Sequence, residues 1–171
     1  MSDDETFQIV PDADGAREAA SRLFVQRSKL LRSQLTVPAD IRHIGATAVP
    51  GCVTKGDLDI VVRVAAEDFD KADVCLARML DRNKGSVRTA TFAAFEDNSA
   101  APHLGVQLAA IDGPEDFFHL FVDALNASPP LVAAYHELKT RFDGHPMDEY
   151  RRAKDAFVAR VLRQARGEGE P

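Results

Sequence analysis

Apolar side chains recur three or four residues apart in four parts of the chain, and this spacing predicts amphipathic helices. The four segments are residues 12–35, 68–82, 128–142 and 145–166. Asp12 or Asp14 is the expected N-cap of the first helix, and Ser128, followed by Pro129, is the expected start of the third. One more helix is expected after the segment "DGPED", with Pro114 near its first turn.

Between these helices lie short runs rich in β-branched and apolar residues, which predict strands. They are "IRHIG" at 41–45, "DLDIVVRV" at 57–64, "SVRTATFAAF" at 86–95 and "HLGVQLAAI" at 103–111. The second run ends in consecutive apolar residues, as central strands do. Strands in the middle and helices at both ends predict a layered α+β or α/β fold, with helices on one mixed sheet. We expect one domain over residues 1–166 and a disordered tail over residues 167–171.

The composition agrees with a folded globular protein, because the 171 residues are 45% hydrophobic and 28% charged. A net charge of −6 argues against general nucleic-acid binding, although a local basic patch could still hold a small anion. No apolar run reaches the roughly 18 residues of a membrane helix, and the acidic start "MSDDETF" does not resemble a signal peptide. We therefore expect a cytoplasmic protein in which Cys52 and Cys75 form no disulfide.

Charge is unevenly distributed along the chain. Residues 1–130 carry a net charge of −7, whereas residues 131–166, which include the last two predicted helices, carry +3. These helices either expose ordinary solvated faces or place a basic wall beside an anionic ligand. The sequence leaves both alternatives open.

Two aspartates one residue apart begin the second predicted strand. Side chains alternate along a strand, so Asp57 and Asp59 are expected to point to the same face. Two carboxylates on one buried face need a partner, and a divalent cation such as Mg²⁺ suits hard oxygen ligands. The alternative is that water hydrates the pair at the start of the strand, with Lys55 nearby.

The segment before these aspartates has the features of a tight phosphate-binding turn. Gly45 follows the first predicted strand and allows a sharp exit or the close approach of a ligand. Ala46 is small, and Thr47 offers a hydroxyl group beside backbone N–H groups. Glycine after a strand is also common in ordinary turns, so the turn alone does not identify a ligand.

Together these residues resemble a known family. The stretch "HIGATAVPGCVTKGDLDI" is similar to the signature HIGSTAVPG…AKPxxDI of the GrpB family, which resembles nucleotidyltransferases of the DNA polymerase β type. The strand "HLGVQLAA" and the helices from "FFHLFVDALNASPP" to "DEYRRAKDAFVARVLRQA" resemble later family motifs in the same order. The resemblance covers most of residues 40–165. It implies an α+β fold, with a mixed β-sheet of nucleotidyltransferase type, helices packed on it and a C-terminal helical segment.

The resemblance also implies an activity, the metal-dependent transfer of a nucleoside monophosphate from a nucleoside triphosphate to an unknown acceptor. Asp57 and Asp59 would be the catalytic carboxylates and the ligands of Mg²⁺ or Mn²⁺. The two Tyr-Lys pairs of the last helices are spaced four residues apart and so share a helix face, although tyrosines there also suit a core. The implied substrate-binding residues are His43, Gly45, Ala46, Thr47, Lys55, His103, Gln107, Tyr135, Lys139, Tyr150 and Lys154.

Two departures from the family pattern favour a second interpretation. Ala46 replaces the serine of the signature, and the strand "HLGVQLAAI" offers Gln107 but no third carboxylate. Glu96, Asp97 and Asp112 lie near strand ends and are the remaining candidates for that carboxylate. The alternative to an enzyme is therefore a non-catalytic module that binds a nucleotide or a protein through the same cleft.

Overall fold

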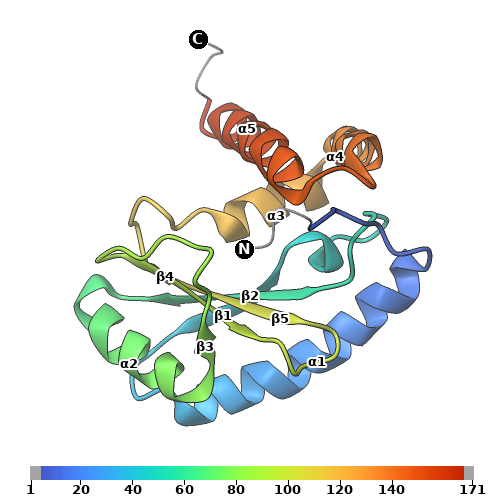
Figure 1. Cartoon of the computed structure of the whole chain (residues 1–171). Helices are drawn as coiled ribbons and strands as arrows, with labels where there is room; N and C mark the ends of the chain where they lie inside the picture. The colour runs from blue at the N-terminus through green and yellow to red at the C-terminus, as the bar shows by residue number, and fades with distance from the viewer. Residues whose placement is uncertain (1–4, 168–171) are drawn as a thin grey trace.

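The computed structural model describes residues 5–167 and contains a mixed sheet of five strands (Figure 1). The strand order is β1–β2–β5–β4–β3, in which β2 and β5 are parallel and the other neighbours are antiparallel. The central strands β2 and β5 are apolar over most of their length because helices cover both faces of the sheet. The strands are β1 Asp40–Ile44, β2 Leu58–Val64, β3 Asp81–Arg82, β4 Phe92–Asp97 and β5 Leu104–Ala110.

The helices form two layers, which confirms the α+β fold with a mixed sheet. On one face, α1 and α2 share a core with Leu58, Ile60 and Val62 of β2; on the other, α3 contacts the sheet and packs with α4 and α5 in a second core that includes Val61 and Ala109. Figure 1 shows α1 and α2 on one side of the sheet and α3, α4 and α5 on the other. None of the helices within residues 5–167 is long and apolar enough to cross a membrane. The helices are α1 Ala13–Gln34, α2 Phe69–Met79, α3 Phe118–Ala127, α4 Pro129–Phe142 and α5 Met147–Ala165, with short 3₁₀ turns η1 Ala46–Ala48 and η2 Ala66–Asp68.

The predicted starts of α1 and α4 are confirmed. The carboxylate of Asp12 accepts the N–H of Gly15 at 2.9 Å, and the hydroxyl of Ser128 accepts the N–H of Leu131 at 3.4 Å. Pro129 is the first residue of α4. Each cap gives a side-chain acceptor to a backbone N–H of the first turn, so local sequence favours these helix starts.

The helix predicted over residues 68–82 is too long, because α2 ends at Met79 and the next residues form the edge strand β3. The guanidinium of Arg82 donates to both carboxylate oxygens of Asp73, at 2.9 and 2.7 Å, and lies 5.0 Å from the ring centroid of Phe95. These contacts, together with pairing to β4, hold Arg82 in an extended conformation.

Two other predicted boundaries are wrong. The strand predicted over residues 86–95 begins only at Phe92, and the helix predicted after "DGPED" begins only at Phe118. The hydroxyl of Thr91 donates to the carboxylate of Glu115 at 2.8 Å, so the loop before β4 is bonded to the loop before α3. Of the tail predicted at residues 167–171, residues 168–171 lie outside the described part of the chain.

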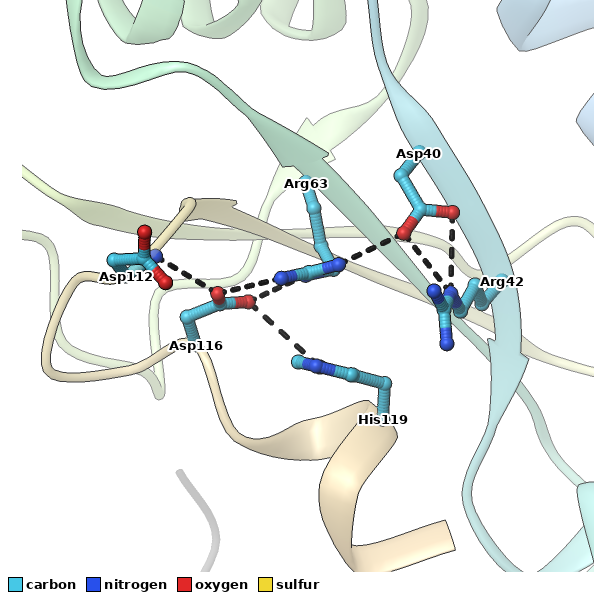
Figure 2. A network of polar contacts seen from close by, with 6 residues as sticks. All are labelled: Asp40, Arg42, Arg63, Asp112, Asp116 and His119. Atoms are coloured by element: carbon cyan, nitrogen blue, oxygen red, sulfur yellow. Dashed lines mark hydrogen bonds and ion pairs between the residues drawn. The ribbon is translucent and has the colours of Figure 1, made fainter. Parts of the chain in front are cut away.

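A partly buried ion-pair network joins β1, β2 and the loop before α3 (Figure 2). Arg63 donates to both carboxylate oxygens of Asp116, at 2.6 and 2.8 Å, and to Asp40 at 2.8 Å. Asp116 also accepts the N–H of Asp112 at 2.9 Å, and its carboxylate lies 3.7 Å from Nδ1 of His119. The network fixes the loop before α3 against the sheet, at the opposite end of β2 from the predicted aspartates.

The N-terminal strap, residues 5–10, links the C-terminal helices to the segment before β2. The N–H of Phe7 donates to the carbonyl of His145 at 2.9 Å, and the N–H of Gly144 donates back to the carbonyl of Phe7 at 2.7 Å. Farther along, the N–H of Val10 donates to the carbonyl of Thr54 at 2.9 Å. No sequence pattern predicts these contacts, because the strap is neither a regular helix nor a strand of the sheet.

Candidate functional site

A small pocket opens where β2 begins, between the sheet and the helices α4 and α5. Its volume is about 50 Å³, and it brings both predicted aspartates together with three predicted lysines. Its walls are formed by Phe7, Ala46, Thr54, Lys55, Asp57, Asp59, Tyr135, Lys139, Tyr150 and Lys154. Of these residues, only Phe7 and Thr54 are missing from the set predicted from the sequence.

Asp59 is held between two glycines that leave room for its carboxylate. A Cβ atom at Gly45 would lie 2.7 Å from one carboxylate oxygen, and a Cβ atom at Gly105 would lie 2.8 Å from the other. Gly45 also has a backbone φ of +76°, a value that residues with a side chain rarely adopt. Burial raises the pKa of Asp59, the charge of Lys154 opposes this rise, and the charge of Asp57 adds to it.

One carboxylate oxygen of Asp57 lies close to a lysine and to a histidine. Its Oδ2 lies 2.9 Å from Nζ of Lys55 and 3.6 Å from Nδ1 of His103. The other ring nitrogen of His103 lies 3.7 Å from the carboxylate of Glu96. Glu96 is therefore linked to the pocket through His103 and is not itself part of the wall.

The other predicted polar residues near β4 and β5 lie outside the pocket. Gln107 lies on the same face of the sheet as Asp59, because it is two residues from Gly105, the partner of Asp59 on β5. It does not line the pocket. Asp97 accepts a hydrogen bond from Arg27 at 2.8 Å, and Asp112 belongs to the network at the far end of the sheet. Neither Asp97 nor Asp112 can supply the third carboxylate at this position.

His43 and Thr47, which are predicted to contact a ligand, lie behind the pocket and not on its wall. The hydroxyl of Thr47 donates to the carbonyl of Asp57 at 3.0 Å and lies 2.8 Å from Nε2 of His43. Since the hydroxyl donates its one hydrogen to the carbonyl of Asp57, it accepts a hydrogen bond from the N–H at Nε2 of His43. Burial lowers the pKa of His43 to about 4, and its ring stacks on Phe24 of α1. The pair therefore positions the backbone of Asp57.

Lys139 reaches the pocket from α4 although only 3% of its surface is exposed. Its Nζ donates to the carbonyl of Val53 at 2.9 Å and lies 4.6 Å from the ring centroid of Tyr135. Burial lowers the pKa of Lys139 to about 7. Its charge therefore changes near neutral pH, and an anion in the pocket would favour the charged form.

The remaining wall comes from the tyrosines and from α5. The hydroxyls of Tyr135 and Tyr150 lie 3.4 Å apart, and burial raises the pKa of both, so both stay protonated as possible donors. Lys154 follows Tyr150 by one helical turn and also lines the pocket. Two lysines of the basic C-terminal helices thus face the pocket, as the basic-wall alternative predicts.

Three residues that support the site could not be found from the sequence. Phe7 belongs to no periodic pattern, and Thr54 lies in a segment without regular structure. Arg17 of α1 clamps the turn after η1 by donating to the carbonyls of Val49 at 3.0 Å and Cys52 at 2.7 Å. An arginine in a solvated amphipathic helix gives no sequence signal that distinguishes this role.

The donor chemistry of the pocket fits a divalent cation that shares its coordination with a ligand. Asp57 and Asp59 offer carboxylate oxygens, and Mg²⁺ is usually bound by one or two carboxylates together with phosphate oxygens and water. In the part of the chain that the structure describes, no group of three or more His, Cys, Asp and Glu side chains is arranged to hold a metal ion. The neighbour of Asp59 on β5 is Gly105, so that position supplies no further carboxylate.

Gly105→Ala is expected to lower the free energy of unfolding by about 1–2 kcal/mol, because the added methyl group displaces the Asp59 carboxylate. Urea unfolding measures this cost. The Asp59→Ala background is the control, since the cost of Gly105→Ala should disappear when the carboxylate is absent. An equal cost in both backgrounds would mean that Gly105 does not make room for Asp59.

The mixed sheet with its two helical layers is a nucleotidyltransferase-like fold. The Cid1 poly(U) polymerase bound to MgGTP is similar in structure, with a TM-score of 0.51 and 12% sequence identity over 77% of this chain and 41% of the polymerase. The H336N mutant of Cid1 bound to MgATP is similar to the same degree, with a TM-score of 0.50 and 11% identity over 76% of this chain and 42% of the other. At this identity the likeness concerns the fold alone.

The chain belongs to the GrpB family, whose model, described as GrpB protein, matches residues 16–164. A UPF0157 protein of Vibrio cholerae serotype O1 is 35% identical over 154 residues, which are 90% of this chain and 81% of that protein. The crystal structure of the conserved protein GrpB from Enterococcus faecalis has a TM-score of 0.67 and 22% identity, over 86% of this chain and 92% of the other. The family predicted from the motifs is therefore confirmed.

Proposed function

We propose that this protein is a nucleotidyltransferase that transfers a nucleoside monophosphate from a nucleoside triphosphate to an acceptor. One observation carries the proposal: two carboxylates at the start of one strand share a pocket with three lysines. Carboxylates suit a divalent cation and lysines suit phosphate oxygens, and a triphosphate bound with its cation combines both needs. The nucleotidyltransferase-like fold supports this reading of the pocket.

In the proposed reaction an acceptor oxygen bonds to the α-phosphorus while the bond to the bridging oxygen of the β-phosphate breaks. Pyrophosphate leaves, and the proton of the acceptor passes to the solvent. Lys139 and Lys154 would neutralise phosphate charge, while Lys55 holds Asp57 in place at 2.9 Å. Mg²⁺ or Mn²⁺, held by Asp57 and Asp59, would supply further charge neutralisation and orient the phosphates.

A second candidate function is nucleotide binding without transfer. Two features of this chain favour it: Ala46 lines the pocket where the family signature has serine, and the residue beside Asp59 on β5 is Gly105, which leaves no room for a further carboxylate. The two candidates differ in one product. An enzyme releases pyrophosphate from a nucleoside triphosphate when an acceptor is present, whereas a binding module leaves the nucleotide intact.

Nucleoside triphosphates with Mn²⁺ are expected to raise the melting temperature by about 5–10 °C at a hundred times the dissociation constant, because they bind only the folded state. Lys154→Met should remove most of this rise, since it deletes a pocket cation. Arg152→Met is the matched control on the same helix, because the side chain of Arg152 is 75% exposed and is not part of the pocket wall. If none of the four common nucleoside triphosphates raises the melting temperature with Mn²⁺ or with Mg²⁺, the proposed function is wrong.

A further inference from the structure

The N-terminal strap closes one wall of the pocket with an aromatic ring. Phe7 is 1% exposed, lines the pocket, and stacks on Tyr150 with ring centroids 3.7 Å apart and planes inclined by 11°. Most aromatic side-chain pairs have centroids 4.5–7 Å apart and are offset or perpendicular. Here the two faces overlap almost completely, which is how a nucleobase lies on an aromatic side chain.

The pocket is too small for a nucleoside while this stack is in place. Its volume of about 50 Å³ compares with roughly 300–1,000 Å³ for sites that enclose small molecules. A phosphate group with its cation is compact and can bind at the open side, but a base needs a wall to move. Which wall can move follows from how each one is held.

Phe7 is held by contacts outside the sheet, unlike the aspartates of the pocket. Tyr150 is fixed by α5 and by its hydroxyl contact with Tyr135, and Lys139 and Lys154 come from α4 and α5, which pack on each other and on α3. The strap is bonded to the loop before α5, through the carbonyl of His145 and the N–H of Gly144, and to the first residue of α5, through the N–H of Met147; none of these groups belongs to a strand of the sheet. Phe7 packs in a small cluster with Met147 and Tyr150 that is separate from the two main cores. The strap can therefore leave without opening the sheet.

We propose that the ring face of Tyr150 is a stacking subsite for a planar heteroaromatic base, and that Phe7 occupies this subsite when no nucleotide is bound. This inference rests on the proposed nucleotide-binding function and adds to it a subsite and a competition. Binding of a base displaces Phe7 and releases the strap, so the closed strap lowers the apparent affinity for nucleotides. A polyphosphate without a base does not use Tyr150 and does not compete with Phe7.

Calorimetric titration with Mn²⁺ and ATP, GTP or inorganic tripolyphosphate tests this competition in the parent and in Phe7→Ala. Phe7→Ala is expected to raise the affinity for at least one nucleotide about tenfold, which is the scale of the free energy of one stacked base. It is expected to change the affinity for tripolyphosphate less than about twofold. Met147→Ala is the control, because it removes packing from the same cluster but leaves Phe7 on Tyr150. It should change nucleotide affinity less than about twofold.

Three outcomes would overturn the subsite. If Phe7→Ala leaves nucleotide affinity unchanged or lowers it while tripolyphosphate still binds, Phe7 only packs against Tyr150. If Met147→Ala raises nucleotide affinity equally, general loosening explains the gain. If the parent and all variants bind neither nucleotides nor tripolyphosphate, the proposed function fails and the subsite fails with it. Should Phe7→Ala not fold, Phe7→Leu keeps apolar volume without a ring and is expected to change the affinities in the same direction.

Amide hydrogen exchange gives an independent readout on the parent protein. The N–H groups of Phe7, Gly144 and Met147 donate to carbonyls across the strap contact, at 2.9, 2.7 and 2.8 Å. With Mn²⁺, the nucleotide that binds should accelerate exchange at these amides, and tripolyphosphate should not. Slower exchange at these amides with nucleotide would show that the strap closes on the ligand, which contradicts displacement.

Discussion

Asp57→Asn is expected to reduce Mn²⁺-dependent nucleotide affinity about 100-fold or more while leaving the fold intact. Asparagine keeps the shape of the side chain but removes a full negative charge beside the cation. The attraction lost is a few kcal/mol at close range, which corresponds to a change in affinity of about 100-fold. Titration calorimetry of parent and variant, with and without Mn²⁺, measures the loss.

The stability of the Asp57→Asn variant should be close to that of the parent. The side chains of Asp57 and its partner Lys55 are 21% and 40% exposed, and exposed ion pairs contribute about 0–1 kcal/mol. Burial is the main cause of the raised pKa of Asp59, and the charge of Asp57 adds to it, so removing that charge also relieves some repulsion. The melting temperature should therefore change by no more than about 4 °C.

Asp148→Asn is the matched control for this prediction, because Asp148 is 72% exposed at the start of α5 and lies outside the pocket. It should retain the Mn²⁺-dependent affinity of the parent. Equal affinity in the parent and Asp57→Asn, or a large fall in the melting temperature of Asp57→Asn, would mean that the aspartate pair is structural. The catalytic proposal would then be abandoned.

Arg63→Met should destabilise the protein by about 3–5 kcal/mol, the usual cost of leaving a buried charge without its partner. The side chain of Asp116 is only 4% exposed, and Arg63 donates to both of its carboxylate oxygens (Figure 2). Chemical denaturation measures the change. Arg42→Met is the control in the same network, because the side chain of Arg42 is 44% exposed and its pair with Asp40 should contribute less than about 1 kcal/mol.

A double variant separates loss of the ion pair from loss of packing. Arg63→Met combined with Asp116→Leu removes both charges, and buried pairs replaced by apolar groups often cost little. The double variant is therefore expected to regain part of the stability that Arg63→Met loses. If it is less stable than the single variant, the cost arises from packing and not from an unpaired carboxylate.

The same network predicts how stability depends on pH. Burial alone would raise the pKa of Asp116, but hydrogen bonds from Arg63 and from the N–H of Asp112 hold this pKa below its usual value. The hydrogen bond from Arg42 lowers the pKa of Asp40 despite burial. A carboxyl group whose pKa is lower in the folded state than in the unfolded chain stabilises the folded protein. This stabilisation is complete above the unfolded-state pKa of about 3.9 and is lost as the pH falls through the folded-state pKa. Urea unfolding between about pH 7 and pH 3 should show a smaller loss in Arg63→Met than in the parent.

The sequence by itself determined the parts of the fold and the site that depend on local geometry. Asp57 and Asp59 reach one pocket because side chains two residues apart lie on the same side of an extended chain. The Tyr-Lys pairs of α4 and α5 do so because residues four apart share a helix face. Asp12 and Ser128 cap their helices through bonds to residues three positions away. All of these relations are set within a few residues, so the order of amino acids is enough to predict them.

Only the tertiary structure decided which groups meet across the chain. Lys139 bonds to Val53, 86 residues away, and its lowered pKa follows from what packs around it and not from its neighbours in sequence. His43 lies behind the pocket because the turn after β1 directs Thr47 to the backbone of Asp57. Phe7 covers Tyr150 without any pattern in the sequence to predict it. The physical reason is that burial and close contact depend on how distant segments pack, whereas periodicity reports only the direction of a side chain within its own element.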